Sequence, residues 1–151
     1  MKLELETQTS LSPEQVVAAL TDFSERRPYM WTGISPHHYK VFSVGETSAD
    51  VREGTKQGPI DVWAREQYDW SKPNTVVWTV KESNFCTPGS YVKAEIYPRE
   101  GGGSTIKSTW DRTATSASGR FIFAAMKLSR GKVIENSMRK GLTNYEREMG
   151  T

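Results

Sequence analysis

The sequence predicts an α+β fold in which a curved antiparallel sheet wraps around a long C-terminal helix. From Val41 to Thr113, apolar and polar residues alternate in segments joined by short turns, which is typical of antiparallel strands. Beyond Ser118, apolar residues recur every three or four positions, which is typical of an amphipathic helix. A long apolar helix face needs a wall to pack against, and a sheet that curls around it leaves a central cavity.

Length and composition are typical of one globular domain, which we place at 1–151. The chain has 151 residues, of which 36% are hydrophobic and 25% are charged. No apolar run approaches the roughly eighteen residues of a transmembrane helix, so we expect no integral membrane segment. The first residues lack the apolar centre of a signal peptide. The single cysteine, Cys86, has no partner for an internal disulfide, so we expect a cytoplasmic protein.

The N-terminal segment predicts one strand followed by one helix. Residues 2–9 alternate apolar and charged side chains, as a half-buried strand does. Ser12 is a good helix N-cap, Pro13 suits the first helical position, and Gln15 can close a capping box. The apolar face that follows predicts a helix ending near Ser24.

The middle of the chain predicts six strands connected by turns. Turns are expected at Gly58-Pro59, at Ser71-Lys72-Pro73-Asn74 and at the glycines 101–103. The predicted strands are 41–44, 50–57, 60–70, 75–82, 91–97 and 104–113. The segment 50–57 is polar, so we interpret it as an exposed or edge strand. The glycine turn lacks the residues of a phosphate-binding loop.

The C-terminal segment predicts a single long helix from about Gly119 to Met149, bent near Gly131. Its apolar stripe consists of Phe121, Ala124, Ala125, Leu128, Gly131, Ile134, Met138, Leu142, Tyr145 and Met149. Seven basic and three acidic residues give residues 118–151 a net charge of +4, against +2 for the whole chain. We interpret the basic residues as a solvated helix face. With so small an overall charge we expect no nucleic-acid partner.

The order of elements resembles the START-like helix-grip superfamily (SRPBCC), and is closest to the small bacterial polyketide cyclase/dehydrase-like proteins. The marks are the helix entry LSPEQV at 11–16, the hairpin YDWSKPN at 68–74 with the following VVW, and TIKSTW at 105–110 after the glycine turn. That superfamily includes polyketide cyclases and dehydratases, coenzyme-Q-binding proteins, plant hormone receptors and pollen allergens. Because it has no universal catalytic signature, the resemblance implies a fold and a cavity, and no reaction.

Strand alternation predicts which side chains face the cavity. The inward faces are Val62, Ala64, Glu66 and Tyr68; Val76, Trp78 and Val80; Val92, Ala94 and Ile96; and Ile106, Ser108, Trp110 and Arg112. A mostly apolar pocket with a few polar groups is typical of a small-molecule site. The predicted ligand-binding residues are Tyr68, Trp78, Ile96, Ser108, Trp110 and Arg112 on the sheet, and Phe121 and Leu128 on the helix. For Trp78 and Trp110, core packing alone is the other interpretation.

Three functions remain open at this stage. The first is binding of a hydrophobic small molecule: a lipid, a quinone or a polyketide-like compound. The second is a cyclase or dehydratase in which Glu66, the weak catalytic candidate, transfers protons. If Arg112 pairs with Glu66, we expect the pair to hold Glu66 ionised and make it a poor acid. The third is an interaction module whose basic C-terminal helix docks on a partner or an anionic surface.

No metal and no cofactor are expected. The only histidines, His37 and His38, are adjacent in sequence, and neighbours on an extended segment point to opposite sides.

Overall fold

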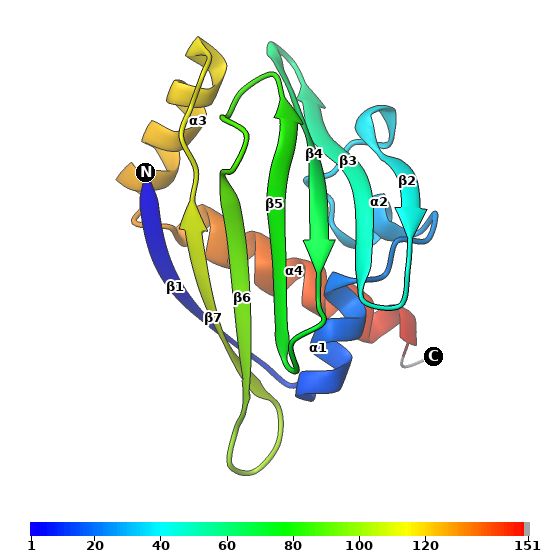
Figure 1. The fold of residues 1–151 in the computed structure, drawn as a ribbon. Coiled ribbons are helices and arrows are strands. Elements are labelled where there is room, and N and C mark those ends of the chain that lie inside the picture. Colours follow the sequence, from blue (N-terminus) through cyan, green and yellow to red (C-terminus); the bar gives the residue numbers. More distant parts are fainter. Residues whose placement is uncertain (150–151) are drawn as a thin grey trace.

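The fold is built on one antiparallel sheet of seven strands, and the computed structural model describes residues 1–149. The strands are β1 (Lys2–Thr9), β2 (Lys40–Val44), β3 (Ser48–Gln57), β4 (Ile60–Asp69), β5 (Thr75–Ser83), β6 (Tyr91–Pro98) and β7 (Ser104–Asp111). Their order is β1-β7-β6-β5-β4-β3-β2. Figure 1 shows the sheet curving around a helix that crosses one of its faces. The predicted fold class is therefore confirmed; the last two positions of the predicted domain, 150–151, lie outside the described residues.

The strands follow the alternation in the sequence, with one correction at β3. Its inner residues Ala49, Val51 and Glu53 are buried, and β2 is the edge strand on this side of the sheet. The prediction that 50–57 is an exposed or edge strand is therefore wrong. The segment looked polar as a whole because only every second residue of a strand faces inward, and the outward-facing residues here are polar.

The first helix, α1 (Pro13–Leu20), begins as predicted and ends early. The Ser12 hydroxyl accepts a hydrogen bond from the Gln15 amide at 3.2 Å, and the Gln15 side chain accepts one from the Ser12 amide at 2.9 Å. The helix stops short of Ser24, where the Asp22 carboxylate accepts a hydrogen bond from the Ser24 amide. A four-residue helix, α2 (Arg27–Met30), and a 3₁₀ turn, η1 (Pro36–His38), follow.

The predicted C-terminal helix is divided into α3 (Ala117–Leu128) and α4 (Lys132–Met149). The division lies at the predicted bend, but the expectation of one continuous helix is wrong. Arg130 and Gly131 have φ angles of 54° and 79°, which interrupt the helix. A Cβ at Gly131 would lie 2.2 Å from Leu5 Cδ2, so a side chain at this position would require the Leu5 side chain to move.

Helix α4 packs across the concave face of the sheet and carries the larger core. Its buried residues Ile134, Met138, Leu142 and Tyr145 face the sheet and α1. Gly141 leaves the α4 backbone bare where Trp31 crosses it: a Cβ there would lie 2.1 Å from Trp31 Cε3. Over residues 1–149, no helix is long and apolar enough to span a membrane.

Helix α3 covers a second, smaller core at the other end of the sheet. This cluster consists of Ala64, Val80, Cys86 and Phe123, with Phe85, Ile122 and Met126 packed against it. Only Gly119 and Phe123 of the α3 residues are buried. The two cores leave unfilled space between them, and that space forms the candidate site.

Candidate functional site

A cavity of about 880 Å³ lies between the concave face of the sheet, α3, α4 and the segment 31–34. The sheet contributes mainly β3 and β4, which together present Glu53, Val62, Ala64, Glu66 and Tyr68. The further lining residues that concern us are Arg27, Trp31, Trp78, Phe85, Trp110, Arg112, Ile122, Phe123, Met126 and Met138. Apolar and aromatic side chains form the larger part of the lining, as in small-molecule sites. The other polar lining residues are Thr32, Thr55, Gln57, Asn136, Ser137 and Lys140.

The sheet residues predicted from alternation fall into two groups. Tyr68, Trp78, Trp110 and Arg112 line the cavity, and the Tyr68 and Trp78 rings stack with centroids 5.4 Å apart. Ile96 and Ser108 are buried on the same face of the sheet, yet they do not line the cavity. The core that α4 and α1 build covers Ile96 instead.

The two predicted helix residues lie outside the cavity. Phe121 is 69% exposed and Leu128 is 86% exposed, so the expectation that they face the sheet is wrong. The break at residues 129–131 resets the helical phase, so the stripe that fits α4 cannot be extended back into α3. Ile122, Phe123 and Met126 occupy the inner face of α3 instead, as i, i+1 and i+4 neighbours.

Glu66 and Arg112 meet inside the cavity, as the sequence predicted. The Arg112 Nη2 donates to Glu66 Oε2 at 2.8 Å, and the guanidinium lies 4.8 Å from the Trp110 ring centroid. Arg112 Nη1 donates to the Cys86 sulfur at 3.7 Å, a long contact with a weak acceptor. The Nε of Arg112 is buried and has no hydrogen-bond partner among the described residues. Arg112 therefore lines the cavity and keeps a buried donor that no described residue accepts.

Burial raises the pKa of Glu66 from 4.5 to about 7, because the ionised carboxylate is desolvated. The positive charge of Arg112 opposes this rise, and the negative charge of Glu53 adds to it. The expectation that pairing with Arg112 would hold Glu66 ionised is therefore wrong. Desolvation outweighs the attraction, and Glu66 titrates near neutral pH.

A second buried polar cluster joins α2 to the sheet, and the sequence reasoning missed it. Arg27 donates to Glu53 Oε2 at 3.1 Å and to the Tyr68 hydroxyl at 3.2 Å. Its Nη1 also donates to the carbonyls of Leu20 and Asp22, both at 3.0 Å. The Tyr68 hydroxyl donates to the other Glu53 oxygen. The alternation of Ala49, Val51 and Glu53 was a signal for Glu53, whereas nothing local marks Arg27.

Comparison with solved structures shows which fold this architecture represents. A protein from Thermus thermophilus aligns over 100% of both chains, with a TM-score of 0.75 and 15% sequence identity. An aromatase/cyclase from Streptomyces sp. R1128 matches 99% of this chain and 95% of its own, with a TM-score of 0.76 and 11% identity. A START superfamily protein from Mycobacterium smegmatis matches 91% of this chain and 96% of its own, with a TM-score of 0.68 and 12% identity. The chain has the START-like helix-grip fold. Comparisons with protein families and with curated protein sequences find no match.

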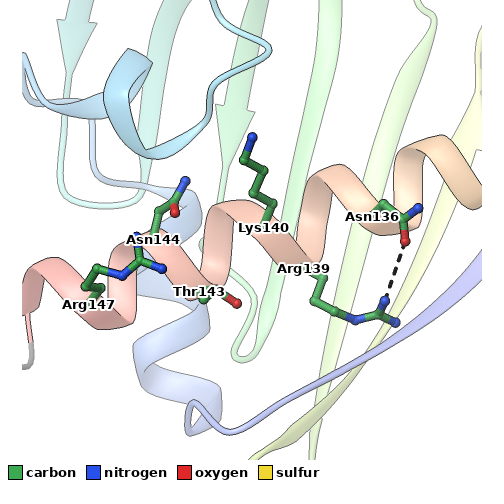
Figure 2. Close-up of a pocket in the computed structure, with 6 residues that line it drawn as sticks. All are labelled: Asn136, Arg139, Lys140, Thr143, Asn144 and Arg147. Carbon is green, nitrogen blue, oxygen red and sulfur yellow. Dashed lines mark hydrogen bonds between the residues drawn. The ribbon is translucent and has the colours of Figure 1, made fainter.

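The helix-grip cavity is not the only depression on the surface. Figure 2 shows polar side chains along α4, two of which, Asn136 and Lys140, also line the helix-grip cavity. These polar side chains line a pocket of about 380 Å³ and are Asn136, Arg139, Lys140, Thr143, Asn144 and Arg147. Arg139 is already engaged, donating to Glu135 at 2.8 Å. Every residue that lines this depression is polar or charged, which does not suit an apolar ligand.

Within residues 1–149, no three His, Cys, Asp or Glu side chains gather where they could hold a metal ion. His38 Nε2 is hydrogen-bonded to the Asp61 carboxylate, and the His38 ring lies 4.9 Å from that of His37. The histidine pair has this local structural role.

Proposed function

We propose that the protein binds a hydrophobic small molecule in the cavity between the sheet and the C-terminal helices. The observation that carries this proposal is a cavity of about 880 Å³ with a mainly apolar lining, beside which the buried Arg112 has an Nε–H with no partner among the described residues. Burying a donor without a partner costs about 1–3 kcal/mol. A ligand that supplies an acceptor would recover this free energy.

The charges around the cavity favour a neutral ligand with an accepting oxygen. The buried charged residues lining the cavity are two arginines and two glutamates, and the exposed Lys140 lines it as well. The buried charges balance when Glu66 is ionised, so a neutral ligand leaves this balance unchanged, whereas the Arg112 Nε–H lacks an acceptor among the described residues. A ketone or quinone carbonyl meets this need. Within the predicted range of ligands, the geometry therefore favours a quinone or polyketide-like compound over an unfunctionalised lipid chain.

Two matched probes test the proposal. The ketone 2-acetylnaphthalene and the hydrocarbon 2-ethylnaphthalene have nearly the same shape, and only the ketone has an acceptor. We expect both to shift the indole N–H signals of Trp78 and Trp110 in NMR titrations, with the ketone binding about tenfold more tightly. Failure of both probes to bind contradicts the proposal. Equal affinities contradict only the role of the carbonyl.

A matched pair of variants locates the carbonyl contact. In Arg112→Met the preference for the ketone is expected to disappear, because the unpartnered donor is gone. Arg139→Met removes an arginine that is exposed on α4, outside the cavity, and is expected to keep the preference. A preference that survives in Arg112→Met places the carbonyl elsewhere.

The pKa of Glu66 supports an enzyme as the second candidate function. A carboxyl group with a pKa of about 7 in a cavity is suited to proton transfer at neutral pH. Glu66 contacts Arg112, so a carbonyl on Arg112 would have its α-carbon near this group. The ionised Glu66 would take a proton from the α-carbon, and Arg112 would stabilise the enolate oxygen.

The same ketone tests this second candidate. Enolisation in D₂O replaces the methyl protons of 2-acetylnaphthalene by deuterium, which NMR detects as loss of the methyl signal. If the cavity is catalytic, wild type accelerates this loss and Glu66→Gln does not, while both bind the ketone. Equal exchange rates with and without wild-type protein favour a binding protein.

A further inference from the structure

The outer face of α3 is apolar and has no covering element among the described residues. Phe121 and Leu128 are 69% and 86% exposed, and they are seven residues apart, on one side of the helix. Ala124 and Ala125 lie between them and are also exposed. Val133, at the start of α4, is 52% exposed. Scattered exposed apolar residues are ordinary, but a row along one helix face marks an interaction surface.

Positive charge surrounds this row. Arg120, Lys127, Arg130 and Lys132 are all exposed. From residue 112 to residue 134 the sequence contains no aspartate and no glutamate. Apolar residues on a helix flanked by Lys and Arg are typical of segments that lie in the interface of an anionic lipid bilayer. The like charges also oppose packing of this face against a second copy of the chain.

We propose that the outer face of α3 docks on the surface of an anionic lipid bilayer. In this arrangement Phe121 and Leu128 enter the boundary between headgroups and acyl chains, and the four basic residues lie among the lipid phosphates. Figure 1 places α3 at the margin of the molecule, apart from α1 and α2, so the helix can approach a flat surface. Its opposite face, with Ile122, Phe123 and Met126, lines the cavity. Docking would therefore place one cavity wall against the bilayer.

Vesicle flotation with the full chain tests the docking. Vesicles of phosphatidylcholine with about 30% phosphatidylglycerol are expected to carry the protein, and vesicles of phosphatidylcholine alone to carry much less. Phe121→Ser with Leu128→Ser is expected to weaken partitioning roughly a hundredfold, since two large apolar side chains no longer enter the lipid. Arg120→Gln with Lys127→Gln is expected to weaken partitioning onto the vesicles about thirtyfold. Added salt is expected to weaken the partitioning of wild type as well, because it screens the attraction to the anionic lipid.

Matched control variants show whether vesicle binding depends on the α3 face itself or on any exposed apolar or basic side chain. Tyr29→Ser removes another apolar side chain, 74% exposed on α2, and Lys56→Gln with Lys72→Gln removes two exposed positive charges elsewhere. Both controls are expected to bind vesicles as wild type does. Circular dichroism of every variant would be used to check that it is folded. Absence of vesicle binding by wild type overturns the proposal. An equal loss of vesicle binding in the control variants also overturns it. So does a wild type that binds no vesicles and instead sediments as a dimer, if Phe121→Ser with Leu128→Ser dissociates that dimer.

Discussion

Two buried arginines border the cavity, and their surroundings differ. Arg27 is 4% exposed and donates to the Glu53 carboxylate, the Tyr68 hydroxyl and the carbonyls of Leu20 and Asp22. Arg112 is 5% exposed and has one full-strength partner, Glu66, together with the weak acceptor Cys86. Both guanidiniums also lie over aromatic rings, Phe23 for the first and Trp110 for the second.

The difference separates a structural arginine from one that is available to a ligand. Arg27 ties the turn after α1 to β3 and β4, and each of its three nitrogens donates a hydrogen bond. Arg112 faces the same cavity with a donor that no described residue accepts. Saturated polar networks hold a single structure in place, whereas unsaturated buried groups need a functional explanation.

The sharpest test of this comparison is Arg27→Met. Removing one partner from a buried ion pair is expected to lower the free energy of unfolding by about 3–5 kcal/mol, because the buried Glu53 carboxylate loses its counter-charge. Urea denaturation at pH 7 measures this loss. Arg26→Met is the control: the Arg26 side chain is exposed and lies 3.7 Å from the Asp22 carboxylate, and its removal is expected to change stability by less than about 1 kcal/mol. Similar losses of unfolding free energy in the two variants would contradict a structural role for Arg27.

The pH dependence of stability tests the environment of Glu66. Its pKa rises from 4.5 in the unfolded chain to about 7 in the folded protein, so the folded state binds the proton more tightly. The stabilisation by the bound proton is therefore complete below about pH 4.5 and is lost as pH rises to about 7, a total of about 3 kcal/mol. Glu66→Gln cannot titrate, so its unfolding free energy is expected to lack this fall. Parallel pH profiles for the two proteins would show that Glu66 is not desolvated.

The carboxyl group of Asp50 titrates in a separate pH window and does not interfere with this measurement. Hydrogen bonding to Arg65 lowers the pKa of Asp50 from 3.8 to about 2. Because this pKa is lowered on folding, the stability that the group contributes is present above about pH 3.8 and is lost as pH falls toward 2. Measurements between about pH 4.5 and 7 therefore isolate Glu66 from Asp50.

Tyr68→Phe tests the saturation of the Arg27 cluster with a smaller change. The substitution keeps the ring that stacks on Trp78 and removes the hydroxyl that joins Arg27 to Glu53. Hydrogen bonds to charged groups contribute about 1.5–3 kcal/mol each, so we expect a loss of about 2 kcal/mol in urea denaturation. A loss near zero would mean that the remaining contacts satisfy Arg27 without the hydroxyl.

Arg112→Met is expected to have the smallest effect on stability, about 1 kcal/mol at pH 6. At this pH Glu66, with a pKa of about 7, is largely protonated, so removing the arginine leaves no buried carboxylate. The substitution also removes a buried donor that has no partner among the described residues. Thermal unfolding beside Arg27→Met at the same pH measures the contrast. A loss as large as that of Arg27→Met would make Arg112 a structural residue as well.

Strand alternation was enough to place Glu66 and Arg112 on the inner face, and their pairing followed from the cost of burying each alone. This reasoning succeeds because the side-chain period of a strand is fixed at two residues. It could not give the pKa of Glu66, which depends on the full depth of burial and on Glu53, a residue of another strand. The charge of Arg112 was visible in the sequence; the desolvation was not.

The helices show the limit of periodicity more clearly. The stripe predicted the buried face of α4 from Ile134 to Tyr145, but Met149 is 56% exposed. Extending the stripe back through Gly131 put Phe121 and Leu128 on the wrong side. A positive φ at Arg130, which is not a glycine, has no reliable sequence signal. Arg27 was missed for a related reason, because its partners Glu53 and Tyr68 are brought to it by the sheet and not by any local pattern.

The bare backbone of α4 at Gly141 sets the position of one side of the cavity. Trp31 lies against it, donates its indole N–H to the Ala19 carbonyl at 3.3 Å, and lines the cavity. Glycine in a helix interior lowers helix stability by about 1 kcal/mol relative to alanine, so α4 is locally weaker here than it could be. Because Gly141 has no side chain, the Trp31 indole can lie directly against the α4 backbone, and this contact sets where the indole borders the cavity. The dimensions available to a ligand thus depend on a residue that no ligand would touch.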